Sequence, residues 1–237
     1  MKEYKLIGKA VYLVKWKILV VADLHLGYEE SIMERGIFLP REQFSIIKKE
    51  LERILKKIGR VNEIVILGDL KHNFSGVLGQ EWKEGLELIE FLAEKCGKIV
   101  LVRGNHDTIL PSGMKNKIEM RNFYVKGENV FVHGDKYFAE VLDRKIKKIF
   151  LGHKHPAITL RKGVKSEKYK CFLVGRWKGR EIIILPSFFP LVEGSGDYNN
   201  QNLAYKFNLK KFRVYAVVPD STEVLEMGKR GEIKTCD

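Results

Sequence analysis

The six histidines of the chain occur in five short segments, and each segment also carries aspartate, asparagine or glycine. Every segment follows an apolar run with the length and composition of a β-strand. The segments are Ala22-Asp23-Leu24-His25, Gly68-Asp69-Leu70-Lys71-His72, Gly104-Asn105-His106-Asp107, His133-Gly134-Asp135 and Gly152-His153-Lys154-His155. Imidazoles and carboxylates together suit Mn²⁺, Fe or Zn²⁺, and the missing thiolates argue against a structural zinc site. The pattern therefore indicates a metal centre.

The spacing within these segments indicates more than one metal ion. Asp23 and His25 are two residues apart, so in an extended chain they share a face and can bind one ion. The same holds for His153 and His155. Two Asp, one Asn and four His exceed the needs of one ion, which predicts two ions ~3.5–4 Å apart with a bridging carboxylate. The glycines of the segments are expected to let the backbone turn sharply at each strand end.

Each segment on its own has a plainer interpretation. A single Asp-x-His is more often an ordinary surface feature than a metal site, and a Gly-Asp after a strand is commoner as a turn. Five such segments that use every histidine of the chain are hard to explain in this way. We therefore favour the metal interpretation.

The apolar runs before the segments predict five buried strands with helices between them. The strands are expected at Ile18–Ala22, Glu63–Leu67, Lys98–Val102, Asn129–Val132 and Lys148–Leu151. Apolar residues recur at helical spacing over Arg41–Ile58 and Glu81–Glu94. Alternating strands and helices are typical of an α/β fold with mostly parallel strands, whose carboxyl ends open on one crevice.

The second half of the chain predicts strands joined by tight turns and one long loop. The strands are expected at Ala157–Leu160, Tyr169–Val174, Glu181–Leu185 and Phe212–Val218. Tight connections are expected at Lys162-Gly163 and Lys178-Gly179. The polar stretch Glu193–Asn208 is predicted as a loop that is either functional or simply mobile. With no repeats and no linker, we expect one domain over residues 1–237, built from two facing mixed sheets with helices outside.

Composition and charge describe a globular chain that favours an anionic partner. Its 237 residues include 43 Lys and Arg against 30 Asp and Glu, which gives a formal net charge of +13. No apolar run approaches the ~20 residues of a membrane span, so no membrane partner is expected. Three widely spaced cysteines favour a reducing cytoplasm. The charge favours nucleic acid, although abundant Lys, Glu and Ile are also typical of hyperthermophile proteins.

Some basic residues are candidates for contact with such a partner. Arg144–Lys148 and Arg161–Lys165 could follow a phosphate backbone, although charged runs are usually solvated surface. Arg103 and Lys154 are further candidates because they neighbour the predicted ligands in sequence.

The five segments, in this order, resemble the calcineurin-like metallophosphoesterase superfamily. Its pattern runs Asp-x-His, Gly-Asp, Gly-Asn-His-Asp/Glu, His and Gly-His-x-His, and the match extends from Asp23 to His155. Within the superfamily the chain is similar to the branch of the SbcD nuclease and, through Tyr28–Pro40 and its compact size, to small archaeal SbcD-related phosphoesterases. The resemblance implies a four-layer α/β sandwich of two mixed β-sheets flanked by helices. It also implies hydrolysis of phosphate esters by a metal-activated hydroxide.

The resemblance further implies a set of metal ligands. One ion would be held by Asp23, His25 and His155. The other would be held by Asn105, His133 and His153. Asp69 would bridge the two. The cofactors expected are two divalent ions, with Mn as the first choice and Fe, Zn or Ni as alternatives.

Three catalytic residues are implied as well. His106 would face the scissile phosphate, and Asp107 would help to position that histidine. His72 matches a histidine that the nuclease branch keeps after its Gly-Asp.

The function stays open between three hypotheses. Hydrolysis of phosphodiesters, DNA or RNA included, is favoured by the net charge and by His72. A small-molecule nucleotide phosphodiesterase or phosphatase is favoured by the short stretch after His155, which leaves little room for the capping domain of the repair nuclease. A non-catalytic scaffold is less favoured, because such relatives usually lose ligands that this chain keeps. The sequence leaves the oligomeric state open.

Overall fold

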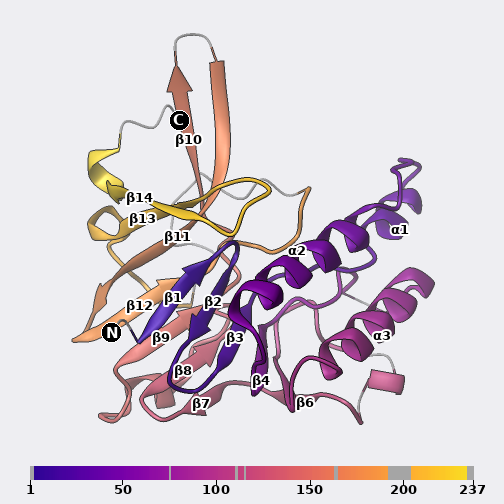
Figure 1. Ribbon diagram of the computed structural model, residues 1–237, viewed down its shortest axis with the longest axis horizontal. Coiled ribbons are helices and arrows are strands. Elements are labelled where there is room, and N and C mark those ends of the chain that lie inside the picture. Colours follow the sequence, from indigo (N-terminus) through magenta and orange to yellow (C-terminus); the bar gives the residue numbers. More distant parts are fainter. Residues whose placement is uncertain are drawn as a thin grey trace.

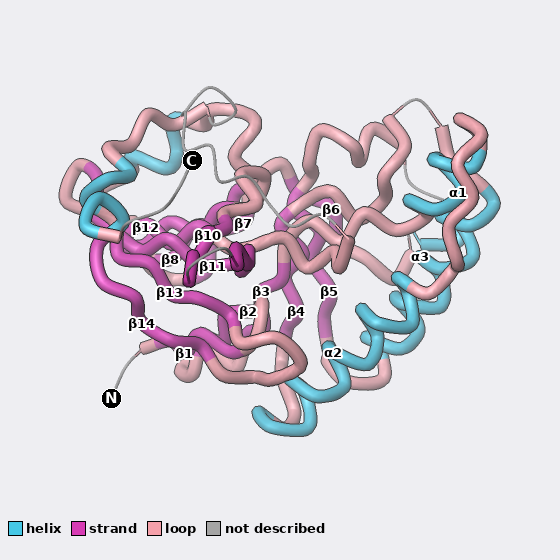
Figure 2. The backbone as a smooth tube through the Cα atoms, turned by 90° about the horizontal axis from the view of Figure 1, so that it is seen from above, coloured by secondary structure: helices cyan, strands magenta, loops and turns pink. Residues whose placement is uncertain are grey.

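Two β-sheets face each other across the middle of the protein (Figures 1 and 2). This computed structural model describes residues 3–74, 76–109, 112–114, 116–162, 165–191 and 204–233. Across the first sheet the strands are β1 (Tyr4–Ile7), β2 (Ala10–Leu13), β3 (Ile18–Val21), β4 (Glu63–Leu67), β5 (Lys98–Val102) and β6 (Glu119–Arg121). Across the second they are β14 (Val224–Lys229), β13 (Arg213–Val217), β11 (Lys165–Trp177), β12 (Arg180–Ile184), β9 (Lys148–Leu151), β8 (Asn129–Val132) and β7 (Tyr124–Lys126). A further strand, β10 (Ala157–Lys162), pairs with β11.

The strands that precede the histidine segments run parallel within each sheet. In the first sheet β3, β4, β5 and β6 are parallel, and in the second β8, β9 and β12 are parallel. Parallel neighbours need crossover connections. The helix α2 (Gln43–Ile58), preceded by the short α1 (Tyr28–Met33), connects β3 to β4, and α3 (Gly79–Ala93) connects β4 to β5. Because of this topology, the loops after successive strands emerge at the same edge of a sheet.

Apolar side chains fill the space between the two sheets. Phe131 and Phe150 of the second sheet stack with their ring centroids 5.0 Å apart. Burial of each such side chain stabilises the fold by roughly 1.5–3 kcal/mol. The fully buried side chains that meet here include Val20, Val65 and Val100 from the first sheet and Phe131, Phe150 and Phe172 from the second. This packing holds the two sheets, and hence their loops, in fixed relation.

The outer faces of the two sheets are covered differently. Helices α2 and α3 cover the first sheet with the apolar stripes that the sequence predicts, through Ile47, Leu51 and Ile54 on α2 and Leu88 and Leu92 on α3. In the described part of the chain, 3₁₀ turns and loops cover the second sheet instead (Figure 2). These turns are η2 (Ala139–Leu142), η4 (Leu209–Lys211) and η5 (Arg230–Glu232), and η1 (Ser112–Met114) lies before β6.

The predicted loop Glu193–Asn208 is only partly described. Residues 193–203 lie outside the described residues. The remainder, residues 204–208, contains Tyr205 and Phe207, which are buried in the core of the second sheet. The described end of this segment is therefore an anchored part of the fold.

The predicted fold class is confirmed, and most of the predicted elements are present. All nine predicted strands and both predicted helices are present, four strands with the predicted boundaries and the other elements shifted by up to four residues. The expected connection at Lys162-Gly163 lies partly outside the described residues. The predicted turn at Lys178-Gly179 has φ angles of 47° and 78°, which are typical of a two-residue hairpin turn. The strands β1, β2, β6, β7 and β14 were not predicted. No helix in the described ranges is long and apolar enough to cross a membrane.

Candidate metal centre

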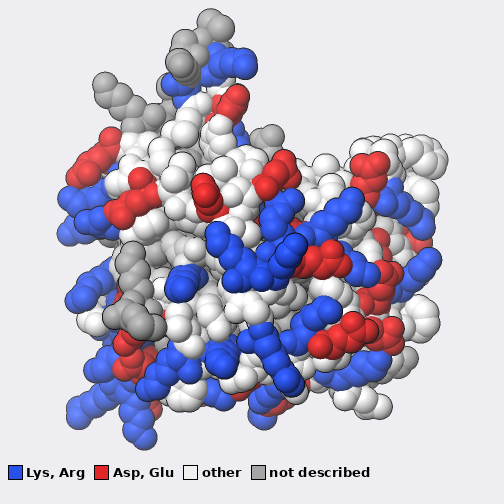
Figure 3. Space-filling model, in the orientation of Figure 1, with Lys and Arg blue, Asp and Glu red and all other residues white. Residues whose placement is uncertain are grey.

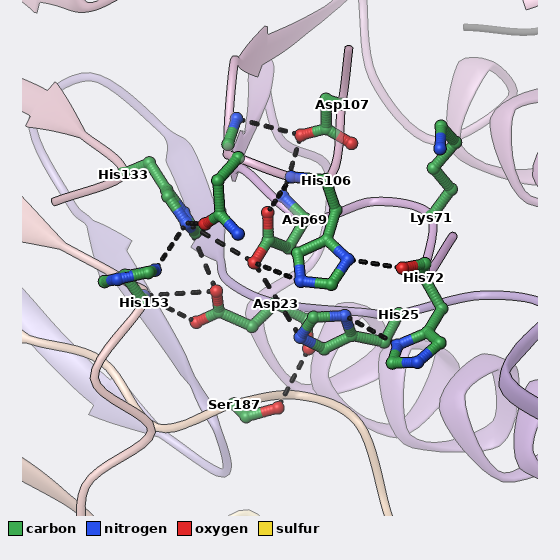
Figure 4. Close-up of polar contacts among 12 residues, drawn as sticks. Asp23, His25, Asp69, Lys71, His72, His106, Asp107, His133, His153 and Ser187 are labelled. Carbon is green, nitrogen blue, oxygen red and sulfur yellow. Dashed lines mark hydrogen bonds and ion pairs between the residues drawn. The ribbon is translucent and has the colours of Figure 1, made fainter. Parts of the chain in front are cut away.

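The five histidine segments meet where the two sheets expose the carboxyl ends of their strands (Figure 4). Eight non-glycine residues of the described chain have a positive φ, and five of them are predicted metal ligands. These five are Asp23 (56°), His25 (48°), Asp69 (51°), His153 (64°) and His155 (47°). Left-handed backbone costs a non-glycine residue roughly 1–2 kcal/mol. Such strain clusters at functional sites, because the surrounding structure must enforce it.

The first cluster of potential ligands consists of Asp23, His25 and His155, with one ligand atom of each within 4.8 Å of the others. His155 Nε2 lies 3.4 Å from Asp23 Oδ1. This nitrogen is buried and makes no hydrogen bond within the described ranges. The Asp23 carboxylate is fully buried and accepts a hydrogen bond from the backbone N–H of His153 (3.0 Å). A buried nitrogen that faces a carboxylate without bonding to it fits a cation held between them.

The second cluster consists of Asp69, His133 and His153. His133 Nδ1 lies 2.8 Å from the carbonyl of Leu67. Because a carbonyl only accepts, Nδ1 carries the proton and Nε2 is left to face the centre. There Nε2 lies 3.1 Å from Asn105 Oδ1 and 3.0 Å from His153 Nδ1. An amide oxygen and two imidazole nitrogens thus converge beside the Asp69 carboxylate, as the donor set of a divalent cation would.

The Asp69 carboxylate lies between the two clusters. Its Oδ2 is 3.9 Å from His25 Nε2 in the first cluster and 3.4 Å from His133 Nε2 in the second. Its Oδ1 accepts a hydrogen bond from the backbone N–H of His106 (3.1 Å). One oxygen therefore faces both clusters while the other is held by the backbone (Figure 4).

His106 lies beside both clusters. Its Nδ1 donates a hydrogen bond to the carbonyl of His72, so its Nε2 is turned toward Asp69 Oδ2, at 3.9 Å. The ring of Phe74 covers that of His106, with centroids 3.6 Å apart, and Phe74 is 52% exposed. The histidine is thus fixed on one side by a carbonyl and on another by an aromatic ring.

His72 approaches His25 rather than the second cluster. Its Nδ1 lies 3.4 Å from His25 Nδ1, and its ring packs edge-on against Tyr28 with centroids 4.8 Å apart. His25, His72 and His106 form a third possible ligand cluster, but it shares His25 with the first.

Asp107 binds backbone rather than the ring of His106. Its carboxylate is fully buried and accepts hydrogen bonds from the N–H groups of Asp69 (2.7 Å), Leu70 (3.0 Å) and Gly104 (2.9 Å). No bond from this carboxylate to the His106 imidazole is found among the described residues. Asp107 therefore ties the loop after β4 to the loop after β5, and any effect on His106 passes through the backbone.

Glycine is needed at these strand ends for two different reasons. Gly68 has a φ of 73°, as a sharp turn requires. Gly104 begins a turn, in which its carbonyl accepts a hydrogen bond from the N–H of Asp107 (3.3 Å), but its own φ is not positive. A Cβ at Gly104 would lie 2.2 Å from Asp69 Oδ1 and 2.5 Å from Asp69 N, so the residue must be glycine because the neighbouring loop passes so close.

Burial keeps most of the imidazoles neutral. It lowers the pKa of His25 to about 3 and, together with the nearby His106, that of His72 to about 4. Burial also lowers the pKa of His106 and His153. A neutral imidazole is the form that offers a lone pair to a metal, so these environments fit ligation.

The second cluster attracts positive charge. Burial by itself lowers the pKa of His133, but the carboxylates of Asp69 and Asp23 outweigh burial and raise this pKa to about 10. Burial together with the charge of Asp69 raises the pKa of Asp107 to about 6. The negative field that favours a proton on His133 also favours a metal cation at the same place.

Sequence reasoning missed the segment that supports Asp23. Ser187 is fully buried, and its Oγ donates a hydrogen bond to the Asp23 carbonyl (2.9 Å). The N–H of Phe189 donates to the same carbonyl (3.2 Å), and the Phe189 ring packs on Tyr28. The available signal was the position of Ser187 between Pro186 and Pro190, directly after a strand.

Glu81 is a second residue whose role the sequence did not indicate. It is 1% exposed, and its carboxylate accepts hydrogen bonds from the N–H groups of Asn73 and Leu78 (3.0 Å for the latter). The loop held in this way carries His72 and Phe74. Glu81 therefore supports the part of the centre that surrounds His106.

The two candidates for substrate contact have other surroundings. The guanidinium of Arg103 lies against Met120 Sδ, with Nη2 at 2.9 Å. Lys154 is buried, at 4% exposed.

Comparison with known proteins identifies the family. Residues 17–218 match the family model of the calcineurin-like phosphoesterases. The chain belongs to this family. It is a metal-dependent phosphoesterase, and the convergent His, Asp and Asn side chains fit the divalent metal that the family uses. A search of curated proteins finds no match.

Among solved structures, one nuclease shares the fold. The nuclease MPE of Pseudomonas putida is 20% identical, with a TM-score of 0.66 over 92% of each chain. Vacuolar protein sorting 29 from Cryptosporidium parvum is 16% identical, with a TM-score of 0.40 over 90% of this chain and 97% of its own. At these identities the likeness to the nuclease shows a common fold and nothing more.

Proposed function

We propose that this phosphoesterase uses two divalent metal ions, with Mn²⁺ as the first choice and Fe, Zn or Ni as alternatives, to hydrolyse phosphodiester bonds of nucleic acid. The observation that carries the proposal is the Asp69 carboxylate, which faces one ligand cluster at 3.9 Å and the other at 3.4 Å. Two separate clusters that share one carboxylate are the arrangement that two-metal hydrolysis requires.

In this proposal the ligands of one ion are Asp23, His25 and His155. Those of the other are Asn105, His133 and His153. Asp69 bridges the two. When bound, the pair of ions would supply an activated water and positive charge for the phosphoryl oxygens.

His106 is the proposed proton donor. The carbonyl of His72 and the carboxylate of Asp69 both favour the protonated imidazole, which opposes the effect of burial. The pKa of His106 is nevertheless lowered overall, so the proposed role requires the protonated form, which holds a proton at Nε2 and would transfer it to the leaving oxygen, whose departure as an alkoxide is otherwise slow. Phe74 and the His72 carbonyl keep the ring in one orientation for this transfer.

Nucleic acid is supported as the substrate by two observations. The net charge of +13 favours a polyanion. The fold is shared with a protein described as a nuclease, MPE of Pseudomonas putida. The reduced thiol of Cys96 is consistent with the cytoplasmic location that we also propose.

A substrate panel tests the proposal. The Mn²⁺-loaded protein is assayed on single- and double-stranded DNA, RNA, cyclic nucleotides and bis-p-nitrophenyl phosphate at several salt concentrations. We expect metal-dependent cleavage of nucleic acid that falls steeply with salt, while hydrolysis of the small diester changes little. Cleavage confined to small nucleotides would instead support the alternative of a nucleotide phosphodiesterase or phosphatase. A lack of activity on every substrate would contradict the proposal.

A further inference from the structure

A basic pocket lies apart from the metal centre, between four elements. It has a volume of about 350 Å³ and is bounded by the β1–β2 turn, α2, the start of β11 and the β13–β14 turn. Its cationic lining residues are Lys9, Lys49, Arg53, Lys168 and Lys170, against the acidic Glu50 and Asp220. None of the predicted metal ligands lines it. In the view of Figure 3, Lys and Arg side chains gather near the middle of the face that carries α2.

Two of the lysines form the inner wall of the pocket. Lys9 pairs with Glu50 (2.6 Å) and donates a hydrogen bond to the Phe188 carbonyl (2.8 Å). Lys170 donates to the carbonyls of Ser187 (3.0 Å) and Phe189. The segment 187–189, which supports Asp23 through its N–H and hydroxyl groups, is thus held by these lysines through its carbonyls. The pocket and the metal centre share this segment as a common wall.

Three of the cations carry unneutralised charge at the rim. Lys49, Arg53 and Lys168 are exposed, and in the ranges that the structure describes they form no ion pair. Glu50, the carboxylate of the same helix that lines the pocket, is already paired with Lys9. Lys49 and Arg53 are four residues apart on α2, so they project from one face and repel each other. An anion in the pocket would relieve this repulsion.

The basic surface continues beyond the pocket along the hairpin of β10 and β11, which projects above the rest of the molecule in Figure 1. In this hairpin Arg161 pairs with Ser166, and Thr159 pairs with Lys168. Alternate residues of a strand share a face, so Arg161 lies on the same face as Lys168. β10 begins at Ala157, directly after the segment that carries His153 and His155. The cations therefore form a line that starts near the metal centre, which suits an extended polyanion.

We propose that this pocket and the adjoining hairpin face bind phosphate groups of a single nucleic-acid strand at positions outside the bond that is cleaved. The inference rests on the proposed function, because the pocket would bind those parts of the proposed nucleic-acid substrate that lie away from the metal centre. Phosphates and lysine or arginine side chains pair through charge without regard to base sequence. The pocket would therefore add affinity and hold the strand in place, and it would not select a sequence.

Binding without cleavage tests the inference. The protein, kept free of metal with EDTA, is titrated into a fluorescein-labelled single-stranded DNA of roughly 20 nucleotides, longer than the ~4–16 nucleotides that one such site covers. The test variant is Lys49→Glu combined with Lys168→Glu. The matched control is Lys210→Glu combined with Lys211→Glu, which makes the same change of charge at two exposed lysines of η4 that do not line the pocket. Thermal unfolding of each variant verifies that it is folded.

We expect the Kd for the oligonucleotide to rise about 10-fold or more in the test variant and to change much less in the control. The slope of log K against log salt should fall by about 1.4 in the test variant, at ~0.7 for each lost phosphate contact on a single strand. Equal weakening in both variants, or no binding by the wild-type protein, would overturn the inference. A parallel titration with inorganic pyrophosphate covers the other source of phosphate. If the wild type binds pyrophosphate but not the oligonucleotide, and the test variant loses this binding, the ligand of the pocket is a small anion instead of a nucleic-acid strand.

Failure of the inference and failure of the proposed function give different results. Hydrolysis of bis-p-nitrophenyl phosphate by the Mn²⁺-loaded wild-type protein depends on the metal centre and not on oligonucleotide binding. If the wild type hydrolyses this diester but the test variant binds DNA as tightly as the control does, the pocket proposal alone is wrong. If the wild type hydrolyses neither the diester nor DNA, the proposed function is wrong.

Discussion

Replacement of Gly104 by alanine should shift the Asp69 carboxylate, the proposed bridging ligand, although no proposed ligand residue is itself substituted. The added Cβ would lie 2.2 Å from Asp69 Oδ1, where ordinary contact begins at about 3.4 Å. The oxygen must therefore move by about 1.2 Å, or the loop after β5 must move instead. Metal sites tolerate deviations of only ~0.2 Å in their ligand distances. The Asp69 carboxylate cannot serve both metals after such a shift.

Gly104→Ala should weaken metal binding more than it lowers the stability of the fold. Overpacking of this kind costs about 1–3 kcal/mol, which corresponds to a fall in Tm of roughly 2–12 °C for a chain of this size. We expect Mn²⁺ affinity to fall by more than the ~10–100-fold typical of residues that only support ligands. Calorimetric titration with Mn²⁺ measures affinity, and circular dichroism measures Tm. The control is Gly97→Ala, whose Cβ would meet only the Asn62 carbonyl at an ordinary 3.5 Å.

A folded Gly104→Ala protein that binds two Mn²⁺ ions with wild-type affinity would show that the position of the Asp69 carboxylate does not matter. Equal losses in Gly104→Ala and Gly97→Ala would show that the effect is not local.

Three further predictions concern single side chains. His106→Ala should lower kcat by roughly 10²–10⁴-fold and leave the metal content unchanged; near-normal kcat would remove His106 from catalysis. Phe74→Ala should lower kcat by roughly 10–100-fold with metal content unchanged, because the ring that covers His106 is lost; an effect on KM alone would show that Phe74 only binds substrate. Burial beside Lys9 lowers the pKa of Lys170 from 10.5 to about 7, with Glu50 opposing. Between about pH 7 and 10 the unfolded chain then binds a proton at Lys170 that the folded chain does not. Stability should therefore rise with pH by at most about 1.4 kcal/mol per unit relative to Lys170→Met. Chemical denaturation of both proteins across this range measures the difference, and a constant difference would contradict the shift.

Most strands could be predicted because they are apolar, β-branched runs. The convergence of the histidine segments could be predicted because each segment follows such a run and carries residue types that bind metals. The strands β1 and β2 were not predicted because they are only four residues long and lysines lie within β1 and on either side of β2. Lys9 is buried there through its pairing with Glu50 of α2, a contact between distant parts of the chain that local sequence does not reveal. Three-residue strands such as β6 and β7 are too short to show a period of two.

Within the centre, ligand types could be predicted but their supports could not. Asp23 and His25 lie in one cluster, as their spacing predicts, but the same prediction is wrong for His153 and His155, which lie in different clusters. The bond from Ser187 to the Asp23 carbonyl joins residues far apart in sequence. The same is true of Asp107, whose carboxylate binds the backbone of another loop. Such contacts depend on how two sheets pack, which no local pattern specifies.

The central claim is that one chain holds two metal ions side by side, and electron paramagnetic resonance of the Mn²⁺-loaded protein tests it most directly. Two Mn²⁺ ions ~3.5–4 Å apart with a bridging carboxylate give the spectrum of an exchange-coupled pair. We predict two Mn²⁺ per chain with coupled spins in the wild type, and loss of both the coupling and at least one ion in Asp69→Asn. A spectrum of isolated Mn²⁺ at one ion per chain, unchanged in Asp69→Asn, would contradict the account.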